Sequence, residues 1–261
     1  MTNTSRPLRI GVAGAAGRMG LAIRNAIASE PGVIAGALWE APGHHAIGSV
    51  EHGVTIAAAP PSEPSTVDVV IDFTSPASTR VLLDHCVRLG TPLVIGTTGL
   101  SPDDHAAIDA AARAVAVLQA ANTSVGVSVL LHLVEETARL LGDSFDLEVV
   151  ESHHRHKRDA PSGTALALVS ALERGRVGLA RTFARHGDIG PRQQNEVGIQ
   201  TIRGGDVIGE HTVFYLGNGE RLELTHRATD RSLFANGALK AASWLAGRPP
   251  GRYAMRDALG L

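Results

Sequence analysis

The N-terminal part of the chain alternates short apolar runs with segments of helical spacing. Leu8–Ala13 is an apolar run, the apolar residues of Arg18–Ser29 recur at the spacing of one helix face, and Val33–Trp39 is a second apolar run. This order predicts a strand, a helix and a second strand. Because such crossovers are right-handed, the two strands are expected to be parallel neighbours in one sheet.

The same alternation continues for two more rounds. Further strands are predicted at Val67–Ile71 and Leu93–Ile95, and helices at Ala77–Leu89 and Asp103–Ala114. Ser101 is a suitable cap for the last of these helices, because Pro102 directly follows it. Repeated strand–helix units of this kind predict a doubly wound parallel sheet.

The pattern changes in the second half of the chain, where a long helix is followed mainly by strands. The turn Gly217-Asn218-Gly219 separates two alternating runs and predicts an antiparallel hairpin. A last helix, Ser232–Ala246, is expected to return to the first domain. The other predicted elements are a helix at Val125–Leu141 and strands at Phe145–Ser152, Gly198–Arg203, Val207–Leu216 and Arg221–Thr225.

We therefore predict an α/β protein with two domains. Residues 1–122 and 228–261 form a doubly wound domain, and residues 123–227 form a second, α+β domain. A chain of 261 residues, 44% of them hydrophobic and 19% charged, is long enough to bury such cores.

Charge and cysteine content exclude several classes of partner. The formal net charge is −2, so no general attraction to nucleic acids or acidic membranes is expected. The polar segment Met1–Pro7 lacks the apolar stretch of a secretory signal, and no run reaches the roughly 20 apolar residues of a membrane span, which favours the cytoplasm. The lone cysteine, Cys86, is interpreted as a buried, inert thiol.

A glycine-rich turn marks the end of the first predicted strand. Gly14, Gly17 and Gly20 form a variant of the Rossmann fingerprint, in which backbone N–H groups and a helix N-terminus approach a pyrophosphate. Close helix packing alone would also explain the glycines. Glu40, at the end of the second strand, can bind the ribose hydroxyls of NAD and would repel the 2′-phosphate of NADP. The turn therefore favours dinucleotide binding.

The densest run of chemically active side chains extends from Glu151 to Ala165. Three histidines and three cations lie within six residues, which favours a cationic pocket for an anionic substrate. In an extended segment, His153, Arg155 and Lys157 would share a face and His154 and His156 would point away.

Two other interpretations apply to this run. A metal site is disfavoured by the alternating directions and by the local positive charge, so we predict none. The sequence Pro161-Ser162-Gly163-Thr164 starts a helix, and either hydroxyl residue could be its cap. The N–H groups of that helix start would also hold a carboxylate.

These residues resemble the dihydrodipicolinate reductase family over nearly the full length of the chain. The matching segments are GVAGAAGRMG, VVIDFTSP, VIGTTG, AANTSVGV, ESHHRHKRDAPSGTA, IRGGDVIGEHTV, LTHRATDRSLFANGAL and MRDAL. The resemblance implies an N-terminal Rossmann domain, a second domain for substrate binding and tetramerisation, and a homotetramer. It also implies hydride transfer from NADH or NADPH to a cyclic dicarboxylate with loss of water, in lysine and diaminopimelate biosynthesis.

The resemblance further implies roles for individual residues. His153 would exchange the proton, Lys157 would be the cation beside it, and His154 would contact the substrate. One substrate carboxylate would be held by Gly163 and Thr164. The residues that would bind the cofactor are Gly14, Ala15, Ala16, Gly17, Arg18, Met19, Glu40, Gly96, Thr97, Thr98, Ala120, Ala121, Asn122 and Thr123.

The chain also departs from the family pattern at several positions. Trp39-Glu40-Ala41 lacks the arginine that often follows the acidic residue, and Ser75 stands where many members have arginine, so we expect a preference for NADH. Thr123 replaces a frequent aromatic residue, and Ser128 replaces a frequent asparagine. Two alternatives are a paralogue that reduces another imine or carbonyl acid, and a nicotinamide-sensing binding protein without turnover.

Overall fold

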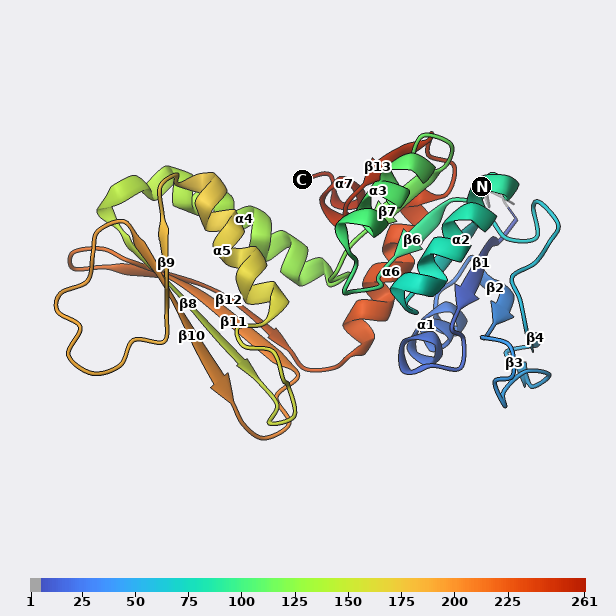
Figure 1. Ribbon diagram of the computed structural model, residues 1–261, viewed down its shortest axis with the longest axis horizontal. Coiled ribbons are helices and arrows are strands. Elements are labelled where there is room, and N and C mark those ends of the chain that lie inside the picture. Colours follow the sequence, from blue (N-terminus) through green and yellow to red (C-terminus); the bar gives the residue numbers. More distant parts are fainter. Residues whose placement is uncertain (1–5) are drawn as a thin grey trace. The chain divides into compact units, whose positions relative to one another are not determined.

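The computed structural model describes residues 6–261, which form two compact units (Figure 1). One unit comprises residues 6–125 and 232–261, and the other comprises residues 126–231. Each has its own sheet and its own hydrophobic core. The predicted combination of a doubly wound domain with an α+β domain is confirmed. Within residues 6–261, no helix is long and apolar enough to cross a membrane.

The sheet of the first unit has eight strands in the order β13-β7-β6-β5-β1-β2-β4-β3. All neighbouring strands are parallel except β3 and β4. From β1 the strands continue through β2 to one edge of the sheet, and from β5 they continue through β6 and β7 to the other. The strand order therefore reverses between β1 and β5, as in other doubly wound folds. The strands are β1 (Leu8–Ala13), β2 (Val33–Trp39), β3 (Val50–Glu51), β4 (Val54–Ala57), β5 (Val69–Asp72), β6 (Leu93–Ile95), β7 (Ala116–Gln119) and β13 (Gly251–Tyr253).

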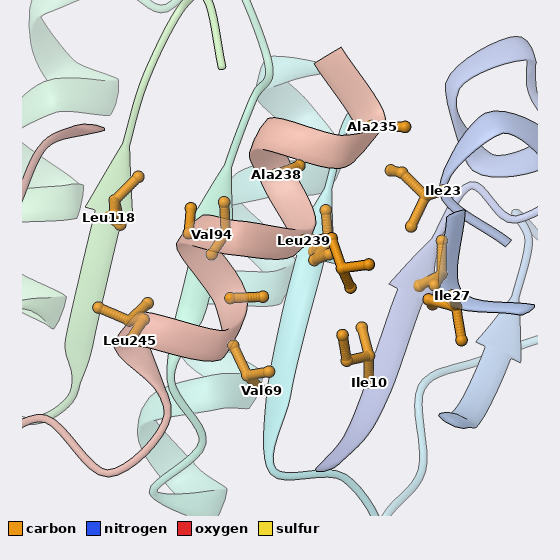
Figure 2. Close-up of a cluster of buried hydrophobic side chains, with 14 of the residues drawn as sticks. Ile10, Ile23, Ile27, Val69, Val94, Leu118, Ala235, Ala238, Leu239 and Leu245 are labelled. Carbon is orange, nitrogen blue, oxygen red and sulfur yellow. The ribbon is translucent and has the colours of Figure 1, made fainter. Parts of the chain in front are cut away.

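Helices cover both faces of this sheet. One core joins strand residues to α1 (Arg18–Ser29), α6 (Ser232–Leu245) and α7 (Met255–Leu259), and the other joins them to α2 (Pro76–Leu89) and α3 (Pro102–Ala111). In Figure 2, Leu239 of α6 lies among the apolar side chains of the strands, and Ala235 lies toward Ile23 of α1. The predicted start of α3 is confirmed, because Ser101 and Asp104 form a capping box around Pro102.

The second unit is a mixed sheet with helices on one face. The strand order is β12-β11-β8-β10-β9, in which β11 is antiparallel to both of its neighbours. Inward residues of β8 and β11 form a core with α4 and α5. The elements are α4 (Val125–Leu141), a 3-10 turn (Gly142–Ser144), β8 (Asp146–His153), α5 (Gly163–Gly175), β9 (Ala180–Phe183), β10 (Glu196–Arg203), β11 (Gly209–Leu216) and β12 (Arg221–Ala228).

Candidate functional site

The predicted cofactor residues follow the carboxyl ends of strands in the first sheet. Gly14–Met19 follows β1, Glu40 follows β2, Gly96–Thr98 follows β6, and Ala120–Thr123 follows β7. Because these strands are parallel, all four segments lie along one edge of the sheet. That edge is where doubly wound folds bind their ligands.

The glycine-rich turn packs α1 tightly against the end of β1. Gly14 has a φ of +64°, a conformation that favours glycine. A Cβ on Gly20 would lie 2.1 Å from the Gly14 carbonyl oxygen, so only glycine permits this approach. Gly17 caps α1 without a side-chain hydrogen bond, and the helix then begins with Arg18 and Met19. The first-turn N–H groups of a helix have no carbonyl one turn before them and are suited to bind an anion.

Glu40 connects the ends of β1 and β2. Its carboxylate accepts hydrogen bonds from Ala16 N at 2.8 Å and from Ala41 N at 3.3 Å. A carboxylate has about four acceptor positions, so Glu40 can also accept from hydroxyl groups. The side chain is thereby held beside the glycine-rich turn.

A buried carboxylate that the sequence interpretation missed organises the next two loops. Asp72 is fully buried at the end of β5 and accepts hydrogen bonds from Thr74 N at 3.0 Å, Thr79 Oγ1 at 2.5 Å and Thr97 Oγ1 at 3.3 Å. Burial raises the pKa of Asp72, although these hydrogen bonds oppose the shift. Thr97 is therefore held by its neighbours, while Ser75 caps α2.

The loop after β7 presents its residues in different directions. Ala121 is exposed and Asn122 half-buried, and the Asn122 side chain accepts a hydrogen bond from Ser124 N at 2.9 Å. Thr123 is fully buried, and its hydroxyl donates to the Phe234 carbonyl at 2.7 Å. The Thr123 side chain thus contributes to the core, and its carbonyl oxygen packs against Gly237 of α6.

In the second unit, the inward face of the sheet becomes polar at one end. Along β8 the buried residues change from Leu147 and Val149 to Glu151 and His153. Along the neighbouring β11, His211 lies directly opposite Glu151. The N-terminus of α5 reaches the same place, because Ser162 N donates to Glu151 at 3.0 Å.

Glu151 is the centre of this polar cluster and has no exposed surface. It accepts hydrogen bonds from His153 Nδ1 at 2.5 Å, from Thr201 at 3.2 Å, and from both terminal nitrogens of Arg203 at 2.8 Å. Burial alone would raise the pKa of Glu151, but the hydrogen bonds from His153 and Arg203 lower it to about 2. The carboxylate is therefore ionised at neutral pH.

His211 is a neutral neighbour of His153. Their rings meet edge to face, with centroids 5.1 Å apart. Burial, followed by electrostatic repulsion from nearby His153 when that ring is protonated, lowers the pKa of His211 to about 4. His211 Nε2 lies 3.0 Å from the Ser162 hydroxyl, which also accepts from Ala165 N and caps α5. A Cβ at Gly209 would lie 3.0 Å from His153 Nε2, so this glycine leaves room beside that nitrogen.

The predicted extended geometry after His153 is wrong. Strand β8 ends at His153, and a turn follows in which Lys157 N donates to the His154 carbonyl. The rings of His154 and His156 lie 6.2 Å apart. The Lys157 ammonium pairs with Asp159 at 2.9 Å.

His154 and the helix start complete the cluster. Burial, followed by the nearby charges of Arg231 and His156, lowers the pKa of His154.

The cap of α5 is Ser162, and Gly163 and Thr164 are the first two residues of that helix. Gly163 is exposed, with no atom within 4 Å of an added Cβ. Across the described residues, no three His, Cys, Asp or Glu side chains are grouped to hold a metal ion.

Comparison with known proteins matches both units to the same protein family. The family model for the N-terminus of dihydrodipicolinate reductase matches residues 8–123, and the model for its C-terminus matches residues 126–259. A 4-hydroxy-tetrahydrodipicolinate reductase of Anaeromyxobacter dehalogenans is 48% identical over 97% of this chain and 98% of its own length. A 4-hydroxy-tetrahydrodipicolinate reductase of Thiobacillus denitrificans is 44% identical over 97% of this chain and 99% of its own length.

Solved structures support the fold. A dipicolinate-bound dihydrodipicolinate reductase from Paenisporosarcina has a TM-score of 0.76 at 20% identity, covering 95% of this chain and 97% of its own. A probable dehydrogenase from Thermotoga maritima has a TM-score of 0.62 at 14% identity, covering 96% and 92%. The family models and the full-length relatives together show that this chain belongs to the dihydrodipicolinate reductase family.

Proposed function

We propose that this protein reduces (2S,4S)-4-hydroxy-2,3,4,5-tetrahydrodipicolinate to tetrahydrodipicolinate with loss of water, in lysine biosynthesis via diaminopimelate. The observation that carries the proposal is the polar end of the second sheet, where the Glu151–His153 pair adjoins the N-terminus of α5. This arrangement offers a proton donor beside an anion-binding helix start, in a chain whose full-length relatives bear that enzyme name.

In this proposal, His153 supplies the proton through Nε2. Lys157 lies four residues further along and, when Asp159 releases it, provides a cation for the substrate. His154 contacts the substrate, and the backbone N–H groups of Gly163 and Thr164 hold one of its carboxylates. The structural support is the position of these groups around one end of the second unit.

The edge of the first sheet suits a nicotinamide dinucleotide, which would supply the hydride when bound. The close turn at Gly14, Gly17 and Gly20 leaves the N-terminus of α1 open to a pyrophosphate. That turn also contains Ala15 and Ala16, and the helix start contains Arg18 and Met19. The nicotinamide side would be lined by Gly96, Thr97, Thr98, Ala120, Ala121, Asn122 and the backbone of Thr123.

We further propose that NADH is preferred to NADPH. The Glu40 carboxylate is held by Ala16 N and Ala41 N, beside the turn where the ribose hydroxyls would lie. A fixed negative charge there repels a 2′-phosphate. The neighbouring Ala41 has no cation to compensate, and Ser75 instead caps α2.

A coupled assay tests the function and the cofactor preference separately. Dihydrodipicolinate synthase would generate the unstable substrate, and oxidation of NADH and NADPH would be followed in parallel. His153→Ala should lose about 100-fold to 10,000-fold in kcat, the usual contribution of a general acid. The control His156→Ala, which alters an exposed residue of the same turn, should retain wild-type turnover.

The outcomes of this assay point to different conclusions. An absence of turnover by the wild type with either cofactor would refute the function, and faster turnover of another imine or carbonyl acid would identify a paralogous reductase. Equal kcat/KM with both cofactors would refute the preference alone. For Glu40→Gln, the advantage of NADH over NADPH should shrink, since the repelling charge is gone.

A homotetramer in the cytoplasm also belongs to the proposal. Helices α4 and α5 cover one face of the second sheet, and no other α-helix lies within residues 126–231. The opposite face presents Ile202, which is 53% exposed and lies opposite Ser152, and Val150 and Phe214 belong to the same face. Light scattering should give the mass of four 27.2 kDa chains. Ile202→Arg should reduce that mass, and a monomeric wild type would refute the tetramer.

A further inference from the structure

The contacts of Glu151 extend from the strand that carries His153 to two other segments of the second unit. Glu151 and His153 are two residues apart on β8, so their side chains share the inward face of the sheet. Thr201 and Arg203 reach the carboxylate from β10, and Ser162 N reaches it from the start of α5. The carboxylate is fully buried and accepts from five donor groups.

An ionised carboxylate can only accept hydrogen bonds, and this fact determines the state of the histidine ring. Because Glu151 Oε2 lies 2.5 Å from His153 Nδ1, that nitrogen must carry the hydrogen. The neutral ring then has its lone pair on Nε2, on the side where Gly209 leaves space. Proton exchange with a ligand is thereby confined to Nε2.

We infer that Glu151 is a positioning residue that fixes the tautomer of His153 and, through Ser162 N, aligns it with the carboxylate-binding start of α5. This inference rests on the proposed role of His153 as proton donor. Glu151 itself does not touch the substrate in this scheme. Its charge stabilises the imidazolium form of His153, and Arg203 weakens that effect by neutralising part of the charge.

Because Arg203 opposes the effect of the Glu151 charge on His153, replacing Glu151 and replacing Arg203 should shift the pH profile in opposite directions. If His153 donates the proton, activity is lost when pH rises and the ring is deprotonated. Glu151→Gln should move this alkaline limb of kcat/KM to lower pH by about 1 to 3 units, the usual effect of a nearby opposite charge. Arg203→Gln should move it to higher pH, by up to about one unit, because Glu151 then acts on His153 unopposed.

The matched control is Thr201→Val. It removes the 3.2 Å hydrogen bond to Glu151 without changing any charge, so the limb should stay in place. The ionisable or charged groups that surround His153 and could also contribute to the profile are Glu151, His154, Lys157, Asp159, Arg203 and His211. His154→Gln and His211→Gln should leave the opposite signs of the first two variants unchanged.

A second measurement reads the histidine without turnover. Hydrogen–deuterium exchange at the imidazole C2 position reports the protonation of His153 at each pH, when tandem mass spectrometry separates its label from that of His154 in the peptide that ends at Arg155. Its midpoint should move with the alkaline limb in Glu151→Gln and Arg203→Gln. If Glu151→Gln fails to fold, Arg203→Gln against Thr201→Val still decides. Unmoved midpoints, or shifts of one sign in both charge variants, would overturn the inference even in a protein that lacks the proposed activity.

Discussion

The close contact between Gly20 and the glycine-rich turn leads to a quantitative prediction for Gly20→Ala. In a helix, glycine to alanine alone stabilises by about 0.5–1 kcal/mol. Here the added Cβ would lie 2.1 Å from the Gly14 carbonyl oxygen and 2.7 Å from two backbone atoms of Ala15. Unstrained contacts are about 3.5 Å, so α1 must move away by roughly 1 Å. Overpacking of this kind costs about 1–3 kcal/mol, which exceeds the gain in helix propensity.

The displaced helix start should also weaken dinucleotide binding. Since the N–H groups of Arg18 and Met19 move with α1, we expect the dissociation constant for NADH to rise at least about tenfold, equivalent to about 1.4 kcal/mol. Urea unfolding and NADH fluorescence titration measure the two effects. Gly204→Ala is the control, because its added Cβ meets no atom within 4 Å. Wild-type stability together with unchanged NADH affinity in Gly20→Ala would refute the reasoning.

Two further predictions concern stability in the second unit. His211 is neutral in the folded protein, with its pKa lowered from 6.5 to about 4, so unfolding gains a proton between these values and stability falls as pH decreases from 6.5 to 4. The loss should be about 3 kcal/mol over the whole range and about 2 kcal/mol between pH 7 and pH 5. Urea unfolding of His211→Gln at pH 7 and pH 5 should show a smaller decrease in stability than the wild type, and an equal decrease in both proteins would contradict this. The buried Tyr215 hydroxyl donates to the Val134 carbonyl at 2.8 Å, so Tyr215→Phe should lower the free energy of unfolding by about 1 kcal/mol. Tyr253→Phe, which loses an exposed bond to Pro249, should cost less, and equal losses would show that burial of the bond has no influence.

Hydrophobic patterning was sufficient to predict the long elements but not the short ones. Strand β1 and helix α1 are bounded by a proline and by glycines, so their limits could be read directly. Strand β7 follows an alanine-rich helix without an intervening turn signal, and it is only four residues long. Its pairing with β13, at the other end of the sequence, involves three residues of that strand. Runs this short carry too few positions for a period to be recognised.

The site was predicted to the extent that it lies in one continuous segment. His153 and the start of α5 could be identified from a single run of residues, whereas Arg203 and His211 reach the same cluster through strand register. Register depends on the whole sheet, and the residue pattern of a single strand does not determine it. Glu151 did leave a signal, since a carboxylate two residues before a histidine in a strand shares its face. The turn after His153 was missed because the run contains no glycine before Pro161.

The placement of α6 has a consequence for how the protein is made. Its residues Ala238, Leu239 and Leu245 cover the apolar face formed by β1, β5, β6 and β7 (Figure 2). The ribosome synthesises those strands more than a hundred residues before it reaches α6. Throughout that interval the nascent first unit has an uncovered apolar face, and the second unit, residues 126–231, is completed before α6 and can fold first. A message cut short before Ser232 would therefore yield an aggregation-prone chain rather than a smaller working enzyme.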